Sequence, residues 1–137
     1  MRDLYSNLTI RRAISPVSEA GTTALVSQII DRHGFDSLVF AIATGSIADA
    51  DATFTVLVED GDNSALSDAA AVADAELNGT EALAAFQFDD DNETRKIGYI
   101  GNKRYVRLTI TPAANASAAV ICAVAILGNA SLQPNGV

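Results

Sequence analysis

The chain has 137 residues, enough for one domain that buries roughly two-thirds of its unfolded surface. Apolar residues make up 49% of the sequence and aromatic residues 6%, so aliphatic side chains must build the core. The formal net charge of −8 argues against nucleic-acid binding, which gains affinity from Lys and Arg contacts to phosphates. The longest apolar stretch is too short to cross a bilayer, and the start lacks the apolar segment of a signal peptide. We therefore expect a soluble product made in the cytoplasm, with no nucleic-acid or membrane partner.

The N-terminal part of the chain predicts an arm followed by strands. Residues 1–7 are polar and predict a short arm with Tyr5 as an anchor. Residues 8–14 predict a strand that ends at Ser15-Pro16, and residues 22–30 predict a second strand from their β-branched and apolar side chains. Residues 35–44 are apolar almost throughout, which predicts a strand deep in a sheet.

The middle of the chain combines a clear strand with an ambiguous segment. Residues 53–59 alternate, with Phe54, Val56 and Val58 on one side, and a turn follows at residues 60–63. Residues 63–77 are rich in alanine and predict either a loop or a short helix capped by Asp68 and stopped at Gly79. Both alternatives remain open for this segment.

Residues 96–112 predict a β-hairpin with its positive charge on the strands. Gly101-Asn102 suits a two-residue connection, because glycine at the first central position fits a type II′ turn. Beyond the turn, alternation predicts that Val106, Leu108 and Ile110 face the core while Tyr105, Arg107 and Thr109 face outward.

The last predicted strand, residues 117–127, is apolar nearly throughout and lacks the alternation of a strand with one wet face. Either both its faces are covered within the domain, or another subunit covers one of them. A polar tail is expected over residues 128–137. Turn signals between the strands, without regular alternation of strands and helices, predict an all-β sandwich or barrel formed as a single domain by residues 1–137.

No residue pattern predicts catalysis, a cofactor or a metal site. His33, the one histidine, lies in a turn, and Cys122, the one cysteine, lies in an apolar run that predicts a buried, inert thiol. The acidic run Asp89–Glu93 lacks the ligand spacing and central glycine of an EF-hand, so a solvated turn is favoured over a calcium site. We therefore expect a binding protein rather than an enzyme, with no catalytic, cofactor-binding or metal-binding residues.

The distribution of charge predicts a protein–protein interface. No Lys or Arg occurs between Arg32 and Arg95, so a fold that joins the two basic clusters would carry a positive patch on an acidic body. The alternative is that these charges only keep the surface soluble. Tyr and Arg are enriched in interface hot spots, which favours a contact role for the following residues. They are Tyr5, Arg11, Arg12, Arg95, Lys96, Tyr99, Lys103, Arg104, Tyr105 and Arg107.

Over roughly residues 36–127, the sequence resembles the decoration, or cement, proteins on the heads of tailed bacteriophages, including jelly-roll cement proteins of the kind found on a Bordetella phage. Four segments carry the resemblance. They are Thr53–Asp62, Ala71–Glu76, Ile97–Gly101 and Lys103–Arg107, of which Gly-Tyr-Ile-Gly and Arg-Tyr-Val-Arg are the most recognisable.

The resemblance implies a jelly-roll-like antiparallel β-sandwich of about eight strands with at most one short helix. It also implies a structural role on the outer surface of the virion, where such proteins bridge subunits of the major capsid protein, commonly as dimers or trimers. The family supplies no transferable site residues, so the interface residues above rest on charge and aromatic content alone. The alternative role is a phage fibre, receptor-binding or carbohydrate-binding sandwich, and the low aromatic content counts against it.

Overall fold

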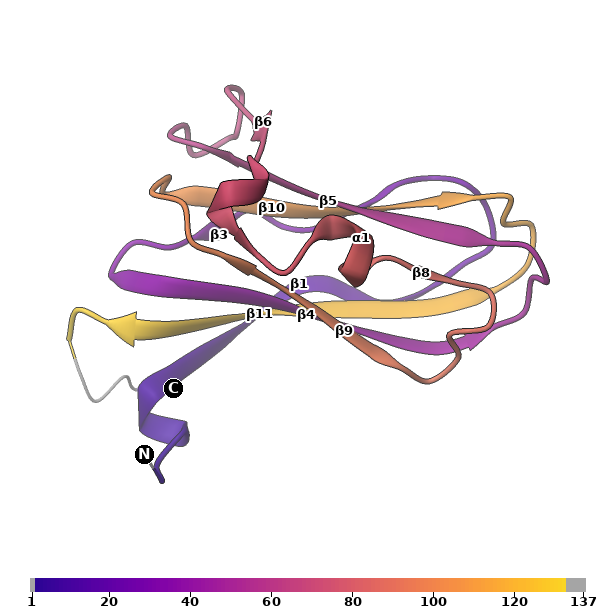
Figure 1. Ribbon diagram of the computed structural model, residues 1–137, viewed down its shortest axis with the longest axis horizontal. Coiled ribbons are helices and arrows are strands. Elements are labelled where there is room, and N and C mark those ends of the chain that lie inside the picture. The colour runs from indigo at the N-terminus through magenta and orange to yellow at the C-terminus, as the bar shows by residue number, and fades with distance from the viewer. Residues whose placement is uncertain (1, 133–137) are drawn as a thin grey trace.

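The computed structural model describes residues 2–132, which form an antiparallel β-sandwich of eleven strands with one short α-helix (Figure 1). Sheet A contains, in spatial order, β1 (Leu8–Glu19), β11 (Ala119–Ala130), β4 (Phe35–Ile47), β9 (Thr94–Tyr99) and β7 (Leu77–Asn78). Sheet B is built on β10 (Tyr105–Ala113) and β5 (Thr53–Gly61), flanked by β2 (Leu25–Val26) and β3 (Ile30–Asp31) beside β10 and by β6 (Ala70–Ala71) and β8 (Phe86–Gln87) beside β5. The helical elements are η1 (Tyr5–Asn7), η2 (Asp74–Glu76) and α1 (Glu81–Ala84).

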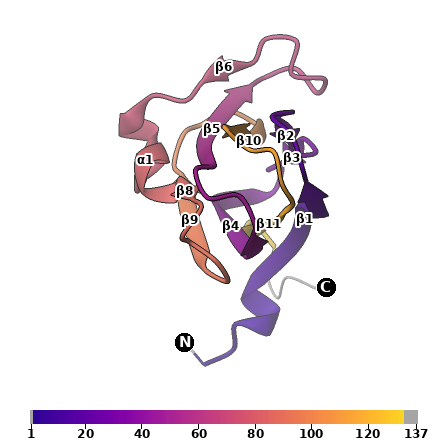
Figure 2. The same ribbon diagram turned by 90° about the vertical axis from the view of Figure 1, so that its right-hand side faces the viewer.

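The strand order is that of a jelly roll, so the predicted fold class is confirmed. When β2 is grouped with β3, and β6 with β8, four positions in sheet B face the strands β1-β11-β4-β9 of sheet A. The chain crosses between sheets from β4 to β5, from β9 to β10 and from β10 to β11, as in paired Greek keys. Figure 2, viewed along the sandwich, shows the two sheets as separate layers.

Alternating side chains from both sheets form one core. The residues predicted to face inward on residues 53–59 and 105–110 are all buried, and the outward ones are exposed or half-buried. In sheet A, Phe40 and Leu127 are completely buried. Phe54 and Phe86 stack at 4.8 Å between ring centroids, which fixes the short strand β8 to the end of β5.

The hairpin predicted for residues 96–112 is wrong. β9 pairs with β4 and β7 in sheet A, whereas β10 pairs with β5, β2 and β3 in sheet B. The connection folds around Arg32, whose guanidinium donates to the carbonyls of Lys103 (2.9 Å) and Gly101 (3.0 Å). These contacts direct the chain across the sandwich, and Gly101 does not adopt the positive φ of a type II′ turn.

Two further strand predictions need correction. β1 continues through Ser15-Pro16 to Glu19, with register shifts between Arg12 and Ile14 and between Ile14 and Val17. An edge strand tolerates proline at such irregularities, because no ladder hydrogen bond is lost. Residues 22–30 form only β2 and the first residue of β3, because the Ser27 hydroxyl accepts the Leu108 amide (2.9 Å) and interrupts the ladder.

The alanine-rich segment is mostly irregular but includes β6, the 3₁₀ turn η2 and the first residue of β7, and α1 lies further along the chain. The Asp68 carboxylate accepts the amides of Asp62 (2.8 Å) and Asn63 (3.2 Å), which closes a turn instead of capping a helix. Thr80 caps α1 by accepting the Leu83 amide at 3.1 Å. Strand β11 extends to Ala130, past the expected end at residue 127; residues 133–137 of the predicted tail, like residue 1 of the arm, lie outside the described residues.

Candidate functional site: the outer face of sheet A

The outer face of sheet B has the composition of a sheet surface in water. Thr55 and Thr111 lie opposite each other and are exposed. Arg107 and Glu59, also opposite each other, form an ion pair at 3.0 Å. Tyr105 lies at the end of this face, with the Arg104 guanidinium 5.1 Å from its ring centroid. This face is therefore mostly polar, with Val26 and Leu57 beside Thr109 as its apolar members.

The outer face of sheet A is apolar. Ile10, Ile126 and Val39 form one row across β1, β11 and β4, because they are cross-strand partners in register. The next rows pair Val124 with Ala41 and Cys122 with Ala43. Within the described part of the chain, no other element covers these rows (Figure 2). We call this surface the sheet A face; it consists of Ile10, Val39, Ala41, Ala43, Val120, Cys122, Val124 and Ile126.

These side chains retain contact with solvent. Ile10 is 61% exposed and Val120 is 39% exposed, while the residues between them are half-buried by their neighbours in the sheet. Cys122 is among the half-buried residues, so the predicted buried thiol is wrong: it points outward while Ile121 and Ala123 point into the core. An uncovered sheet with this composition is unusual for a monomer in water.

The sheet A face is flat at one end and ridged at the other. Its flat end contains Ala43 and Gly45, and a Cβ atom placed on Gly45 would lie 3.0 Å from the Val120 side chain. Its charged groups are Arg12 and Lys96, on either side of the row formed by Val124 and Ala41. No acidic side chain lies on these rows of the described sheet.

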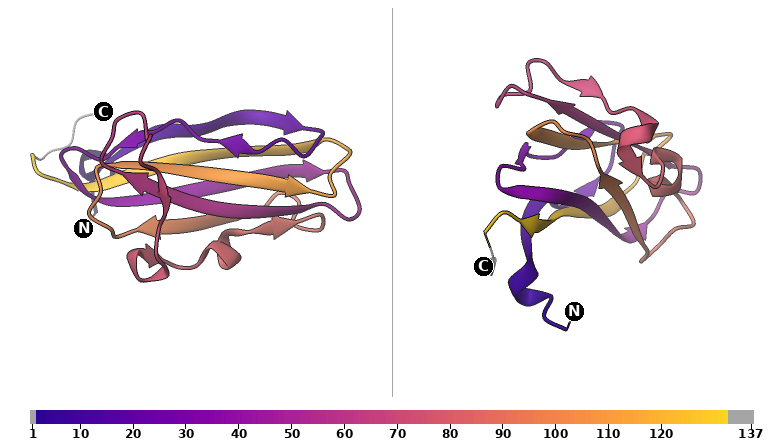
Figure 3. Two further views of the ribbon diagram at one scale, coloured as in Figure 1. Left: turned by 90° about the horizontal axis from the view of Figure 1, so that it is seen from above. Right: turned by 60° about the vertical axis from the view of Figure 1, so that its left-hand side comes forward.

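The N-terminal arm projects from the ridged end of this face. Figure 3 shows η1 leaving the sandwich on the side of sheet A. Leu4 is 60% exposed and Tyr5 is 75% exposed, so the arm makes few contacts with its own domain. Two hollows lie where the arm meets the sheet, one of about 270 Å³ that includes Val39 and Ile126 and one of about 230 Å³ that includes Tyr5 and Ile10.

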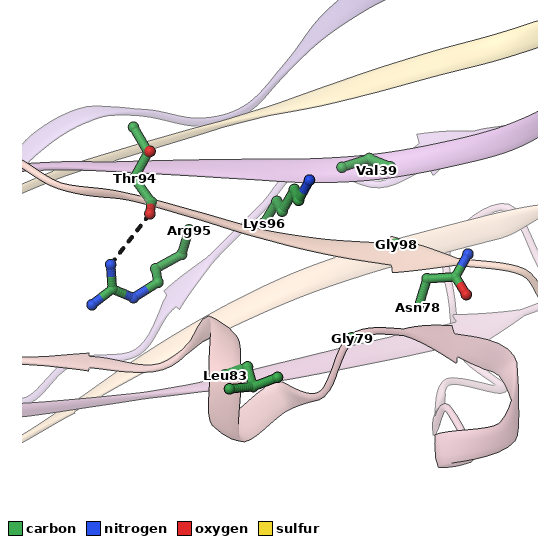
Figure 4. A pocket seen from close by; sticks show the side chains of 8 residues that line it. All are labelled: Val39, Asn78, Gly79, Leu83, Thr94, Arg95, Lys96 and Gly98. Carbon is green, nitrogen blue, oxygen red and sulfur yellow. Dashed lines mark hydrogen bonds between the residues drawn. The ribbon is translucent and has the colours of Figure 1, made fainter.

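A larger groove of about 480 Å³ lies at the other edge of the sheet, beside α1 (Figure 4). It is lined by Val39, Asn78, Gly79, Leu83, Thr94, Arg95, Lys96 and Gly98. Leu83 is 72% exposed and points toward the groove from the helix. The groove contains no aromatic side chain, so it offers no ring for stacking against a sugar.

Most of the predicted basic contact residues are engaged within the chain. Arg104 holds the Asp31 carboxylate with two hydrogen bonds of 2.9 Å, and this pairing lowers the pKa of Asp31 to about 2. Arg95 pairs with Asp90 at 3.0 Å and with Glu93 at 2.5 Å, and Lys103 pairs with Asp62 at 2.5 Å. The structure brings the two basic clusters together around Asp31, but acidic partners balance much of their charge.

The remaining predicted residues lie in different settings. Arg11 donates to the Asp31 carbonyl (2.7 Å) and lies 5.6 Å from the Phe35 ring centroid. Arg12 donates to Ser15 (2.8 Å) and Gln28 (3.2 Å). Lys96 is exposed and forms no ion pair with the described residues.

Tyr99 is 1% exposed and is a core residue, so it cannot contact a partner in the folded chain. Its hydroxyl donates to Asp60 (2.6 Å) and accepts the Lys103 amide (3.0 Å), and the Arg32 guanidinium lies 4.9 Å from its ring centroid. Burial, together with the hydrogen bond to Asp60, raises the pKa of Tyr99 above its ordinary value. This cluster joins the two sheets.

The sequence reasoning missed the β4 half of the sheet A face. The apolar run 35–44 predicted a strand deep in a sheet, whereas its residues Val39, Ala41 and Ala43 lie on the outer surface. The lack of alternation in two strands was the available signal. It did not reveal that β4 and β11 are neighbours, which places both apolar outer rows on one surface.

Other chemistry has little support in the described part of the chain. It contains no group of three or more His, Cys, Asp or Glu side chains placed to hold a metal ion. In the acidic run, Asp90 accepts the Gln87 amide (2.8 Å) and Asp91 accepts the Ile47 amide (3.2 Å), as expected of a turn. Among the described residues, no helix has both the length and the apolar character needed to span a membrane.

No protein-family model matches the sequence, and no curated protein matches it. Among solved structures, the PBSX exported protein XepA superimposes with a TM-score of 0.59 at 12% identity, over 90% of this chain and 38% of that one. This chain therefore spans well under half the length of XepA. The SPBc2 prophage-derived protein YomS superimposes with a TM-score of 0.45 at 12% identity, over 86% of this chain and 95% of that one. A xylan-binding domain from Paenibacillus barcinonensis superimposes with a TM-score of 0.47 at 15% identity, over 91% of this chain and 88% of that one. At these identities the likeness to XepA establishes the sandwich fold and no more.

Proposed function

We propose that this protein is a structural component of a phage particle that decorates the outer surface of the head and binds the major capsid protein. The observation that carries the proposal is the contrast between the two sheets, one with a solvated polar face and one with an uncovered apolar face. Such a contrast is typical of a subunit in an assembly. The sequence resemblance to head decoration proteins supplies the kind of assembly, and the acidic charge agrees with a position outside the DNA.

The mechanism is linkage between binding and stability. A protein that binds the assembled shell but not its separated subunits stabilises the shell by its binding free energy. Many copies act together, so each contact can be weak. The chain supplies a rigid scaffold for this, and its proposed action involves binding without catalysis or a cofactor.

The end of the sandwich that carries the arm is the proposed contact with the shell. It presents exposed Tyr5 on η1 together with Lys103 and Arg104 in the connection from β9 to β10 (Figure 1). Exposed Tyr and Arg side chains at one end suit a hot spot. The charges of Lys103 and Arg104 are shared with Asp62 and Asp31, so this contact draws on aromatic area as well as charge.

A carbohydrate-binding role is less well supported. Sugar-binding sandwiches stack rings against exposed aromatic side chains in a groove. Here the exposed aromatic residues Tyr5, on η1, and Phe88, in the turn after β8, lie in separate segments, and neither lines the groove beside α1.

Sedimentation with phage heads tests the proposal. The purified chain is mixed with heads assembled from the major capsid protein of the genome that encodes it, and bound protein is measured in the pellet. We expect saturable binding and greater resistance of decorated heads to heat. Tyr5→Ala should weaken binding at least several-fold, whereas Leu83→Ala, an equally exposed aliphatic truncation on α1, should not. Heads that neither bind the chain nor gain heat resistance would refute the proposed function.

A further inference from the structure

The sheet A face is an apolar surface without a partner, and its shape and size indicate what covers it. We propose that a second copy of this chain packs on it, sheet A against sheet A, related by a two-fold axis that runs across the strands. This inference extends the proposed function by naming a partner, but it concerns the isolated chain and is measured without capsid protein.

The first argument is shape. The row of Ile10, Ile126 and Val39 forms a ridge at one end; at the other end Ala43 and Gly45 leave β4 flat, and Val120 on β11 stands beside Gly45. A two-fold axis across the strands, between the rows of Val124 and Cys122, places the ridge of each copy over the flat end of the other. An isologous interface requires a patch that is complementary to itself. This face meets that requirement along its length.

The second argument is area. The sheet A face lies on β1, β11 and β4, and the outer side of β9 adjoins it. Together these four strands, spaced about 4.8 Å apart with about eight residues at about 3.3 Å each, present roughly 500 Å² in projection. Side-chain relief and the arm raise the accessible area toward the about 800 Å² that each partner buries in a standard stable interface. The surface is therefore large enough for a specific dimer.

The third argument is charge. Each copy carries a net charge of −8, so two copies repel unless their acidic groups stay apart. The described sheet A face has no acidic side chain, and its two cations, Arg12 and Lys96, lie beside the apolar rows on long side chains that reach water. The acidic groups that carry the negative net charge therefore stay away from this contact. The two-fold axis places Arg12 opposite Arg12 and Lys96 opposite Lys96 of the other copy, so these long side chains must extend outward into solvent at the edges of the interface.

The arm strengthens this arrangement. The arm with η1 projects beyond the ridged end on the same side as the face (Figure 3), and its Leu4 and Tyr5 side chains are exposed. In the two-fold arrangement each arm extends past the flat end of the partner's sheet. The two arms would then bracket the dimer, leaving both Tyr5 side chains at its ends for a further partner.

Sedimentation equilibrium and thiol labelling of Cys122 test the proposal on the full chain. We expect a monomer–dimer equilibrium with a dissociation constant of about micromolar or tighter, as for other interfaces of this size. Labelling of Cys122 by a small disulfide reagent should slow at least ten-fold between a protein concentration well below that constant and one roughly a hundred times above it. Cys122 lies in the middle rows of the face, so its protection reports the surface used.

Two matched substitutions locate the interface. Ala41→Arg adds a long cation to the centre of the sheet A face, beside Arg12 and Lys96, and should give a folded monomer. Thr55→Arg adds the same charge to the outer face of sheet B and should leave the dimer unchanged.

A wild-type chain that stays monomeric at about 100 µM, roughly a hundred times the expected constant, with Cys122 labelled equally fast at every concentration, would overturn the proposal. So would a dimer that persists in a folded Ala41→Arg variant. If that variant fails to fold, the protection of Cys122 in the wild type decides. If Cys122 is protected from labelling only when major capsid protein is added, the sheet A face binds the shell and not a second copy. A dimer that does not bind heads would refute the proposed function and leave this inference standing.

Discussion

The Tyr99 hydroxyl connects segments that are far apart in the sequence. It donates to a carboxylate on β5 and accepts an amide from the connection before β10, while Arg32 covers its ring from the segment before β4. Asp60 is itself 8% exposed, so its oxygen depends on this donor. A buried acceptor that loses its donor carries the full cost of its desolvation.

Tyr99→Phe is therefore expected to lower the free energy of unfolding by about 1–3 kcal/mol, because it leaves the Asp60 oxygen and the Lys103 amide without their partner. Urea denaturation followed by circular dichroism measures this loss. Tyr105→Phe removes a hydroxyl from a half-buried ring and is expected to change stability by less than about 0.5 kcal/mol. Equal effects of the two changes would contradict the role given to Tyr99.

The pair of Asp31 and Arg104 predicts a defined pH dependence. Because the pKa of Asp31 in the folded chain is lowered to about 2, from about 3.9 in an unfolded chain, its contribution to stability is full above pH 4. That contribution declines as the pH falls through the interval from about 4 to about 2, where the carboxylate takes up its proton.

Carbon-detected NMR titration of the Asp31 carboxyl checks this prediction. In Arg104→Gln the pKa of Asp31 should rise toward its ordinary value, since the hydrogen bonds from the guanidinium are its main cause of lowering. Both side chains are partly exposed, so the variant should lose no more than about 1 kcal/mol at neutral pH. The difference from the wild type should vanish below pH 2. An unchanged Asp31 titration would show that the pair does not form in solution.

At the scale of elements, helix α1 seals an exposed edge. Its Glu81 carboxylate accepts the Val58 amide of β5 at 2.8 Å, beside the short pairings of β6 and β8 with that strand. Unpaired edge amides invite pairing with other chains. The helix thereby completes the hydrogen bonding of sheet B where no strand continues.

Glu81→Ala should lower the free energy of unfolding by about 1–2 kcal/mol and expose the Val58 amide. Hydrogen exchange of this amide should accelerate far more than that of Leu108, in the centre of sheet B. Glu81→Gln keeps an oxygen acceptor and should retain most of the protection. Slow exchange of the Val58 amide in the alanine variant would mean that another group accepts its hydrogen bond.

Local pattern predicted the long strands and failed where distant residues decide the structure. The alternation of residues 53–59 was sufficient for β5, because core burial follows directly from period two. The turn propensity of Gly101-Asn102 did not show which sheet contains β10. The chain crosses to sheet B there because Arg32, about 70 residues earlier, binds the carbonyls of the connection. The basic residues were predicted to form a contact patch; that Arg104 and Arg107 pair with Asp31 and Glu59 could not be read from the sequence, since these partners lie far away in it.

At the scale of the whole molecule, the net negative charge opposes association of two copies, whereas the apolar area of the sheet A face favours it. Two copies that carry −8 each repel over distances comparable to the Debye length, about 10 Å at 0.1 M salt. The contact proposed for the sheet A face is apolar and does not depend on ion pairs across the interface.

Self-association is therefore expected to tighten as sodium chloride rises from about 0.02 to 0.5 M, because salt screens the repulsion and leaves the apolar contact intact. Sedimentation equilibrium at several salt concentrations measures the trend. Sodium sulfate should strengthen the dimer further at equal ionic strength, since it favours apolar burial. Weakening by salt would point to an interface held by ion pairs.

The position of β11 has a consequence for how the chain reaches its native state. This strand lies between β1 and β4 in sheet A, although about a hundred residues separate it from β1 in the sequence. Among the described strands β1 pairs with β11 alone, so during synthesis β1 must wait for a partner that lies about a hundred residues further along the chain. Such long-range closure predicts refolding in milliseconds to seconds rather than microseconds. Until it occurs, β1 and the edge of β4 are open, and nascent chains that stall before residue 119 are the ones most exposed to misassembly.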